Sequence, residues 1–263
     1  MKQRKYEETI RMIIAFILYS VFIYFAYTQL VAAQTSTERW LLIALLLPIL
    51  LIAVWYEWIR YLYRKIIYIY NFEVDIHRAV ELMKKLRKSD FLQGFKNNEV
   101  LLMCFYYIDT NQPEPLNQLL DTYEKKLFKK SLDMLLVYNY NKMCYYQMIS
   151  NKTQQKKYFE AILQLQNRKV KGKRISPLYN IESLFAQHYL FHNDLKKAYR
   201  TSTNVNTARS NPREQAYVYY YRYKSAIGLG KLSEAKEFAQ MVIHLGNKLP
   251  IVSMVNEKQG VQP

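Results

Sequence analysis

The stretch Ser225 to Val242, SAIGLGKLSEAKEFAQMV, contains a Gly-Lys pair that could belong to a phosphate-binding loop. Such a loop has a glycine, four further residues and then Gly-Lys-Ser or Gly-Lys-Thr after a strand, because its N–H groups cradle phosphate and its hydroxyl binds Mg²⁺. Here Ser225 stands at the first glycine position and Leu232 at the hydroxyl position. The residues before the pair are not strand-like. Gly230 and Lys231 therefore predict a turn between two helices rather than a nucleotide site.

Histidines and cysteines give no further catalytic or metal-binding pattern. His188 and His192 are four positions apart, a spacing that places both imidazoles on one helix face, but no third ligand is evident. Cys104 and Cys144 are far apart and lack metal-ligand spacing, so we expect two reduced core thiols, with a disulfide as the alternative. Nucleophile elbows, HExxH sequences, paired catalytic carboxylates and glycine-rich cofactor loops are missing from the sequence. We expect a protein that is not an enzyme and has neither a cofactor nor a metal.

A basic cluster in the segment Asn167 to Arg174, NRKVKGKR, could bind phosphate groups of lipid or nucleic acid. The alternative is a solvated loop between two helices of a basic protein. Anionic lipid is favoured over nucleic acid as the ligand, because the chain carries its own membrane segment, described below. The candidate anion-binding residues are Arg168, Lys169, Lys171, Lys173 and Arg174.

Charged and apolar residues occupy different parts of the chain. Of its 263 residues 51% are hydrophobic, yet the formal net charge is +17. Residues 60–263 hold 33 Lys and Arg against 17 Asp and Glu, whereas the first 59 residues are nearly neutral and strongly apolar. Only 6 Gly and 7 Pro are present, which argues against a turn-rich all-β domain. The composition predicts a membrane segment followed by a basic helical domain.

Two apolar runs near the N-terminus are long enough to cross a bilayer. Residues 12–33 form an uncharged run of 22 residues, about 33 Å long as a helix. The second run, 40–59, has 17 uncharged residues before Glu57. Only the six residues QTSTER separate the runs, so we expect a tight hairpin. A cleaved signal peptide ending at VAA is the alternative, but the first run exceeds the ~7–15 apolar residues of such a peptide.

The charges that flank these runs predict their orientation. Four cations precede the first run and three follow the second, while the connection carries one Arg and one Glu. The positive-inside bias therefore places both termini and the remaining chain in the cytoplasm, which we expect to be that of a bacterium, with the runs in its inner membrane. The basic, aromatic segment 60–72 could lie against anionic lipid or continue the second span into the first cytoplasmic helix, and both can hold. The residues expected at the membrane interface are Trp40, Trp55, Trp58, Arg60, Arg64 and Lys65.

Helical periodicity dominates the chain after the two runs. Apolar residues recur at i, i+3, i+4 and i+7, for example at 76–86, 116–127, 195–205 and 235–245. Turn signals separate these stripes, among them Asn211 before Pro212 with Glu214 three residues later, as in a capping box. The sequence predicts an all-α protein with a two-helix transmembrane hairpin in 1–66, helical hairpins in 67–250 and a C-terminal tail in 251–263, after a stop at GNKLP.

The last hairpin resembles the tetratricopeptide repeat (TPR) family. Gly230, Leu232, Ala235, Ala239 and Val242 match its turn and second-helix spacing, and the segment Asn193–Ala198 repeats the turn pattern. Tyr219 stands at the family's tryptophan position, and Ala198 and Ala235 are 37 positions apart, against about 34 in the family. The resemblance covers about residues 70–250 and implies an α-solenoid, in which the first helix of each pair lines a concave groove for a partner.

The resemblance implies a set of groove residues for a protein or peptide partner. They are Tyr217, Tyr220, Lys224 and Ile227 in the last unit and Asn180, Ser183, Gln187 and Leu190 in the unit before. The run YVYYYRY holds more tyrosine than one core face needs, and tyrosine is favoured at interfaces; Tyr219 and Tyr223 are expected in the core.

We therefore expect a membrane-anchored cytoplasmic scaffold or adaptor that binds a protein or peptide in secretion, envelope assembly or signalling. The alternatives are a peptide-responsive membrane-bound regulatory sensor and a binder of anionic lipid or nucleic acid through the basic surface. The spans could also form a homo-oligomer, although neither carries a GxxxG face.

Overall fold

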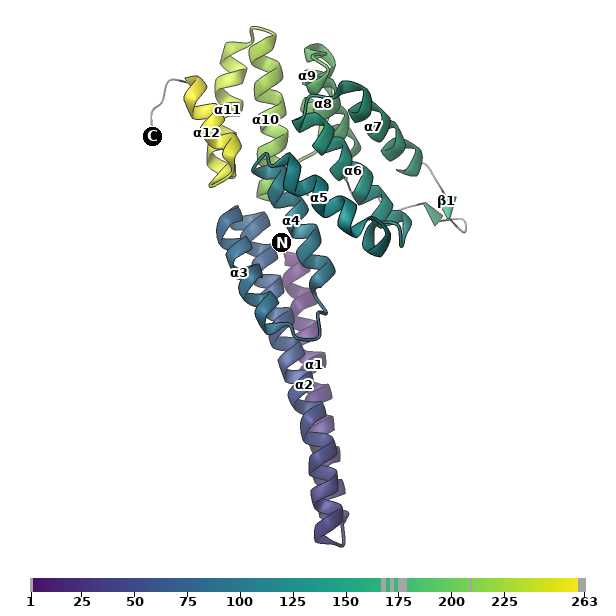
Figure 1. Cartoon of the computed structure of the whole chain (residues 1–263). Coiled ribbons are helices and arrows are strands. Elements are labelled where there is room, and N and C mark those ends of the chain that lie inside the picture. Colours follow the sequence, from purple (N-terminus) through teal and green to yellow (C-terminus); the bar gives the residue numbers. More distant parts are fainter. Residues whose placement is uncertain (1, 167–168, 171–172, 175–178, 209, 260–263) are drawn as a thin grey trace. The chain divides into compact units, whose positions relative to one another are not determined.

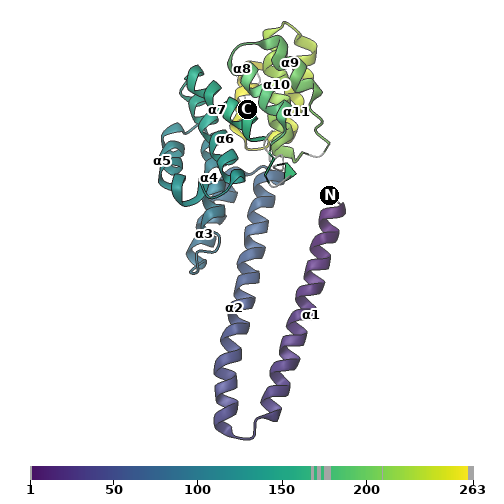
Figure 2. The same ribbon diagram turned by 90° about the vertical axis from the view of Figure 1, so that its right-hand side faces the viewer.

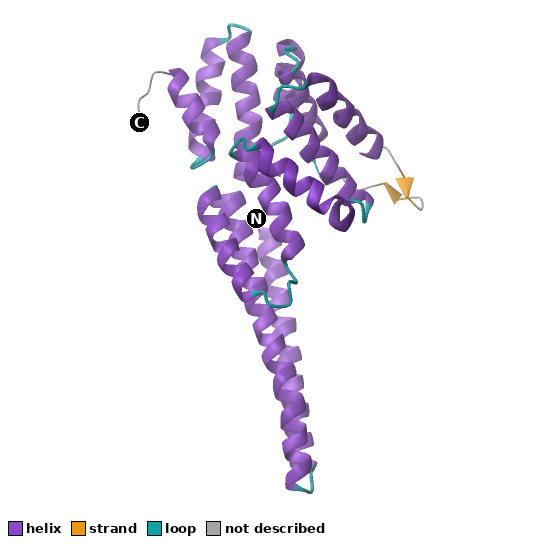
Figure 3. Cartoon of the chain, in the orientation of Figure 1, coloured by secondary structure: helices purple, strands orange, loops and turns teal. Residues whose placement is uncertain are grey.

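The computed structural model of the chain describes all residues except 1, 167–168, 171–172, 175–178, 209 and 260–263. The described part is helical apart from one pair of two-residue strands (Figures 1 and 3), so the predicted all-α class is confirmed. The chain forms two compact units, Met1–Tyr61 and Leu62–Pro263. The boundary lies a few residues before the predicted one, within the helix α2 (Ser36–Tyr68).

The first unit consists of α1 (Lys2–Ala32) and most of α2, joined by a short turn (Figure 2). Thr35 and Glu38 cap α2 as a reciprocal pair: Glu38 N–H donates to Thr35 Oγ1 at 3.2 Å, and Thr35 N–H donates to Glu38 Oε2 at 3.3 Å. Among the described residues, two helices are long and apolar enough to cross a membrane, over Ile13–Ala32 and Ser36–Glu73, and their most apolar stretches are 0% and 6% buried. An apolar surface of this length is suited to hydrocarbon rather than water.

The second unit is a stack of helices that pack in consecutive pairs, each joined by a tight turn. Its α-helices are α3 (Ile76–Ser89), α4 (Lys96–Asp109), α5 (Pro113–Tyr123), α6 (Leu132–Met148), α7 (Lys152–Gln166), α8 (Ile181–Phe191), α9 (Leu195–Asn204), α10 (Pro212–Gly228), α11 (Leu232–Gly246) and α12 (Pro250–Gln259). Two π-helical turns, η1 (Ile69–Glu73) and η2 (Glu124–Phe128), follow α2 and α5. The strands β1 (Lys169–Val170) and β2 (Lys173–Arg174) pair antiparallel, with Lys169 opposite Arg174.

The same turn closes the four hairpins α4–α5, α6–α7, α8–α9 and α10–α11. Two positions before each second helix stands a residue in the left-handed region: Asn111, Ser150, Asn193 and Gly230, with φ of 53°, 58°, 62° and 74°. In every case its N–H donates to the carbonyl three residues earlier, and the next N–H donates to the carbonyl five residues earlier at 2.8 or 2.9 Å. This pair of hydrogen bonds is the Schellman motif, which satisfies the last carbonyls of a helix.

The shared turn answers the question raised by the Gly-Lys pair. The N–H groups of Gly230, Lys231 and Leu232 all donate hydrogen bonds to carbonyls within the turn, so they are not available to bind a phosphate. The Lys231 ammonium is bound to Glu234 at 2.9 Å and lies 4.1 Å from the centre of the Tyr199 ring. The pair is therefore a helix-hairpin turn, as the sequence predicted.

A capping box and a proline mark where two of the last helices begin. Asn211 and Glu214 form the predicted capping box at the start of α10. At the C-terminus the structure differs from the expected tail, because Pro250 begins α12, in which Ile251 and Val255 are buried. A proline that stops one helix can also occupy the first turn of the next, since its N–H has no partner there.

We predict opposite effects for two substitutions at equivalent turn positions. Gly230→Ala should lower the free energy of unfolding by about 1 kcal/mol, because a Cβ disfavours the left-handed conformation. Ser150→Gly should raise it, because it removes such a Cβ at φ 58°. Urea unfolding of the full chain in lipid nanodiscs measures both. Two shifts of the same sign would contradict the equivalence of the turns.

Candidate functional site

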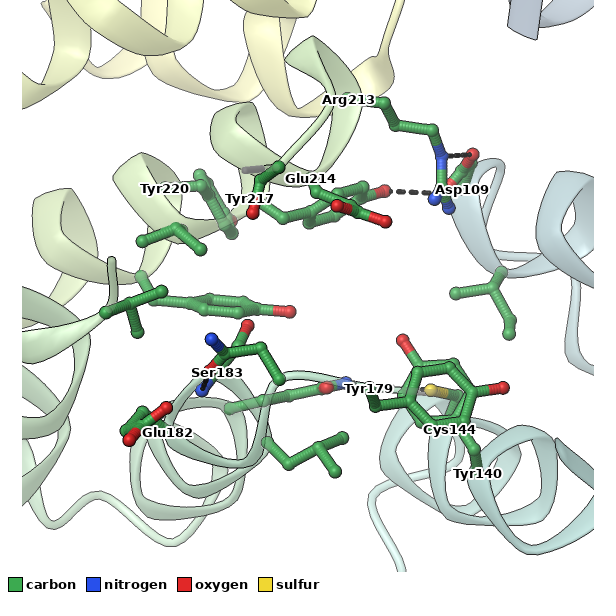
Figure 4. Close-up of a pocket in the computed structure, with 18 of the residues that line it drawn as sticks. Asp109, Tyr140, Cys144, Tyr179, Glu182, Ser183, Arg213, Glu214, Tyr217 and Tyr220 are labelled. Carbon is green, nitrogen blue, oxygen red and sulfur yellow. Dashed lines mark hydrogen bonds and ion pairs between the residues drawn. The ribbon is translucent and has the colours of Figure 1, made fainter. Parts of the chain in front are cut away.

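The second unit contains an open, concave cavity of about 1640 Å³ (Figure 4), and the first helices of successive pairs supply most of its lining. The helices α4, α6, α8, α10 and α12 each contribute; of the second helices, α7 contributes Leu163 alone and α5, α9 and α11 contribute no residue. The alternation follows from the hairpin turns, since each turn places one helix inside the stack and the next outside. Five tyrosines line the cavity, namely Tyr140, Tyr179, Tyr217, Tyr220 and Tyr221, with the amides Asn71, Asn111, Gln147, Asn180, Gln187, Asn206 and Asn211.

The charge of this lining differs from that of the chain. Of the described residues that line the cavity, Arg213 alone is a lysine or arginine, and its charge is matched by Asp109. Glu182 and Glu214 add two exposed carboxylates at the margin. Apolar faces of Phe105, Ile108, Leu184 and Met254, among others, lie between the polar groups. The cavity therefore offers hydroxyls, amides, aromatic faces and a slight excess of negative charge.

A buried ion pair joins the two ends of the stack at one side of the cavity. The Asp109 carboxylate, at the end of α4, is 0% exposed, and the Arg213 side chain is 12% exposed. Arg213 donates from Nη2 to Oδ1 at 2.6 Å and from Nε to Oδ2 at 2.8 Å, a bidentate pair (Figure 4). Tyr217 Oη donates to Oδ1 at 2.8 Å and Tyr70 Oη donates to Oδ2 at 2.5 Å. We call these four residues the closure cluster.

Aromatic rings surround the cation of the closure cluster. The Arg213 guanidinium carbon lies 5.2 Å from the ring centres of Tyr70 and Phe105 and 5.4 Å from that of Tyr217, within the range of cation–π attraction. Burial alone lowers the pKa of Arg213, but the Asp109 charge outweighs it and holds that pKa well above its ordinary value. Burial, and then the Asp109 charge, raise the pKa of Tyr70 and Tyr217. Both phenols therefore stay protonated and donate.

A second set of contacts joins the same two ends. Lys248 Nζ lies 2.6 Å from Asp75 Oδ2, and Lys248 N–H donates to the Val74 carbonyl at 3.3 Å. Asn247 Nδ2 donates to the Glu73 carbonyl at 2.6 Å. The turn between α11 and α12 is thereby bound to the turn between η1 and α3. The stack is closed end to end by residues more than 170 positions apart in sequence.

The predicted groove residues separate into two groups. Tyr217, Tyr220, Asn180, Ser183 and Gln187 line the cavity. Leu190, Lys224 and Ile227 are not part of its lining; they lie nearer the hairpin turns, at the far ends of α8 and α10. Tyr223 is buried in the core, and Tyr219 is half-buried beside Phe238 and under the Arg222 guanidinium.

Sequence reasoning missed Asp109, Arg213, Tyr70, Tyr140 and Tyr179. One signal was present: Asp109 is an acid that follows nine uncharged residues at the C-terminal end of a helix, where the helix dipole disfavours negative charge. Such an acid needs a cation, although the sequence does not say which of 38 it is. The stacking of Tyr140 on Tyr179, with ring centres 4.2 Å apart, depends on the tertiary fold alone.

The other predicted surfaces are placed as follows. Arg168 and Lys171 of the basic cluster lie outside the described residues, while Lys169, Lys173 and Arg174 lie in β1 and β2. Of the expected interface residues, Trp40, Trp58 and Lys65 are exposed and Trp55, Arg60 and Arg64 are half-buried. Arg60 pairs with Glu57 at 3.1 Å.

The histidine pair has a structural role in the second unit. His188 Nδ1 and His192 Nε2 each lie 3.0 Å from the same atom, Oε1 of the buried Gln155. The His188 ring stacks on Phe159 at 4.0 Å. Within the described residues no group of three or more His, Cys, Asp or Glu side chains is placed to hold a metal ion. Both cysteines are buried thiols, and burial raises the pKa of Cys104 to about 12 and that of Cys144 to about 11.

Comparisons with protein-family models, with curated proteins and with solved structures give no match. A function can therefore be inferred only from the chemistry of the cavity and from the two candidate membrane-spanning helices.

We predict that Asp109→Asn lowers the free energy of unfolding by about 3–5 kcal/mol, because it leaves the buried Arg213 cation without its counter-charge. The matched control is Glu160→Gln, which removes an exposed ion pair with Lys156 and should cost less than about 1 kcal/mol. Urea titration of the full chain in nanodiscs measures both. Equal small losses would show that the closure cluster does not hold the stack together.

Acid should destabilise the second unit through His188. Burial first, and then the neighbouring His192, lower the pKa of His188 to about 4. The unfolded chain binds that proton near pH 6.5, so stability is fully present above about 6.5 and is lost as the pH falls toward 4. His188→Asn should reduce the slope of unfolding free energy against pH in this window by up to about 1.4 kcal/mol per unit. Identical slopes for variant and parent would refute the assignment.

Proposed function

We propose that the chain is a membrane-anchored scaffold or adaptor whose helical stack binds a protein or peptide partner in the concave cavity. The observation that carries the proposal is the lining, where tyrosine hydroxyls and amides from successive first helices converge on one space. Tyrosine joins a large apolar ring to a hydroxyl and is enriched in protein interfaces. The volume, about 1640 Å³, exceeds the ~300–1,000 Å³ of small-molecule sites, which favours a peptide segment.

The lining also favours one class of partner over others. Acidic peptides and nucleic acid need unpaired cations, and the one cation among the described lining residues is held by Asp109. Hydroxyls and amides instead suit the backbone and polar side chains of an extended segment. We infer a segment that is neutral or slightly basic, with apolar or aromatic side chains for the ring faces.

The membrane segment gives this binding unit its location. The positive-inside bias favours a cytoplasmic stack and cytoplasmic termini. The 25 Tyr and the abundance of Lys, Ile and Asn favour an AT-rich bacterial source and hence a bacterial inner membrane. The repeated helical hairpin is compatible with TPR-like repeats, although the intervals from 111 to 150, 150 to 193 and 193 to 230 all exceed the ~34 residues of that family. Anchoring would raise the effective concentration of a captured partner at the membrane.

A peptide-responsive regulatory sensor is the second candidate, favoured by Tyr217. Its ring lines the cavity and its hydroxyl belongs to the closure cluster, so a ligand there would contact the group that closes the stack. A sensor ligand would raise the thermal stability of the purified full chain, as mass action requires. An adaptor would instead retain a whole protein that presents such a segment.

We predict that a photo-crosslinking amino acid at Tyr220 captures a protein partner in native membranes. Tyr220 is suited because it lines the cavity without belonging to the closure cluster. The control is the same group at Tyr199, another half-buried tyrosine, which lies on α9 outside the lining.

A cavity-filling variant sharpens the same test. Ser183→Trp should reduce the crosslinked yield at least about tenfold, equivalent to about 1.4 kcal/mol of binding. Ser233→Trp, on the exposed surface of α11, should leave it unchanged. Capture of only lipid and the chain itself, or equal capture from positions 220 and 199, would reject the proposed site.

A further inference from the structure

The loop between α3 and α4 presents two large apolar side chains to the surface. Phe91 and Leu92 are 67% and 60% exposed. The loop holds this form through Asp90, a buried residue whose carboxylate accepts the N–H of Gly94 at 3.1 Å and of Phe95 at 2.8 Å. The apolar tip is therefore built into an ordered loop.

The course of the chain brings this loop back to the beginning of the second unit. After α2 and η1, Val74 takes a left-handed conformation with φ 55° and reverses the direction of the chain. The 14 residues of α3 then span about 21 Å. At the far end the Phe95 ring lies 5.1 Å from the ring of Tyr63, the second residue of the unit. Tyr63 follows the apolar part of α2 by four residues in the sequence.

Cations flank the apolar tip in the sequence, and we call them the basic rim. Residues 76–99 hold six Lys and Arg against three Asp and Glu, and one of these acids, Asp90, is buried in the loop. Lys84, Lys85, Lys88 and Lys96 are all exposed. An apolar tip within a basic rim matches the interface of an anionic bilayer, where rings and aliphatic groups enter the acyl boundary and ammonium groups meet phosphates.

We propose that the α3–α4 loop inserts Phe91 and Leu92 into the surface of the anionic membrane that holds the spans. Three observations support a membrane as the occupant: the basic rim, the exposed apolar tip, and the contact with Tyr63, which lies four residues after the apolar run 40–59. The insertion would give the second unit a lipid contact of its own, separate from the cavity. It does not depend on the identity of the cavity's partner.

The test uses the full-length chain in vesicles of phosphatidylglycerol or of phosphatidylcholine. An environment-sensitive fluorophore is attached through Leu92→Cys; the native Cys104 and Cys144 are buried, so labelling is selective. The matched control is Leu232→Cys, at a leucine that is 72% exposed at the start of α11. In phosphatidylglycerol the probe at position 92 should show blue-shifted emission and at least twofold stronger quenching by shallow nitroxide lipids than the probe at position 232. In phosphatidylcholine this difference should shrink.

A charge variant separates the basic rim from the apolar tip. Lys84→Gln, Lys85→Gln and Lys88→Gln together should reduce quenching at position 92 in phosphatidylglycerol at least twofold. Lys152→Gln, Lys156→Gln and Lys157→Gln, three exposed lysines of α7, should not. Equal quenching at positions 92 and 232 would overturn the proposal. Quenching that depends neither on lipid charge nor on the three lysines of α3 would also overturn it. So would a blue shift without quenching by nitroxide lipids, because that result indicates contact with protein.

Discussion

The hydrogen-bonded pair of Asp109 and Arg213 determines the shape on which the cavity depends. These residues are 104 positions apart and belong to α4 and α10, on either side of the cavity. A buried ion pair stabilises a fold only when the remaining lone pairs and donors are satisfied. Here two tyrosine hydroxyls fill the other carboxylate positions, and three rings cover the guanidinium. A network satisfied in this way specifies one arrangement of the helices it joins.

End-to-end closure has a consequence for binding. An open solenoid bends at every interface between repeats, because each repeat contacts only its neighbours. In this chain the closure cluster and the contact of Lys248 with Asp75 add connections between distant helices. The cavity is therefore preformed, and a partner would not have to supply the free energy needed to order the helices around it. Since Tyr217 belongs to both the lining and the cluster, closure and the proposed binding would share one side chain.

Features encoded by neighbouring residues could be predicted from the sequence. The apolar runs, the Asn211–Glu214 capping box and the turn at Gly230 each depend on a few adjacent positions, and the structure contains all three. The helical face that bears Tyr217 and Tyr220 was also readable. The length of each helix that borders the cavity could not be predicted from the sequence. The prediction therefore included Leu190, Lys224 and Ile227, which lie outside the lining. Periodicity defines the side of a helix, whereas the packing of other helices defines how much of its length borders a cavity.

Side-chain pairs between distant helices could not be predicted from the sequence for a related reason. Asp109 could be recognised as an acid in need of a partner, but a single sequence contains no signal that selects Arg213 among the many cations. The last helix is a different case. Ile251 and Val255, four positions apart after Pro250, already have the spacing of a helix face. The proline that was interpreted as the end of one helix is also the first residue of α12. Proline marks a boundary between helices without indicating whether another follows.

The distribution of charge narrows the choice of partner further. The chain has a formal net charge of +17, yet the described cavity lining contains one cation, which is paired. A strongly basic segment would meet the repulsion of the exterior before it reached Glu182 and Glu214, over a distance of about one Debye length, ~8 Å at physiological salt. A strongly acidic segment would be attracted outside but would find no unpaired cation within. A nearly neutral segment with polar and aromatic side chains would be neither repelled by the basic exterior nor left without partners in the cavity. The basic exterior is then left to interact with the anionic surface beside which the proposed anchor holds it.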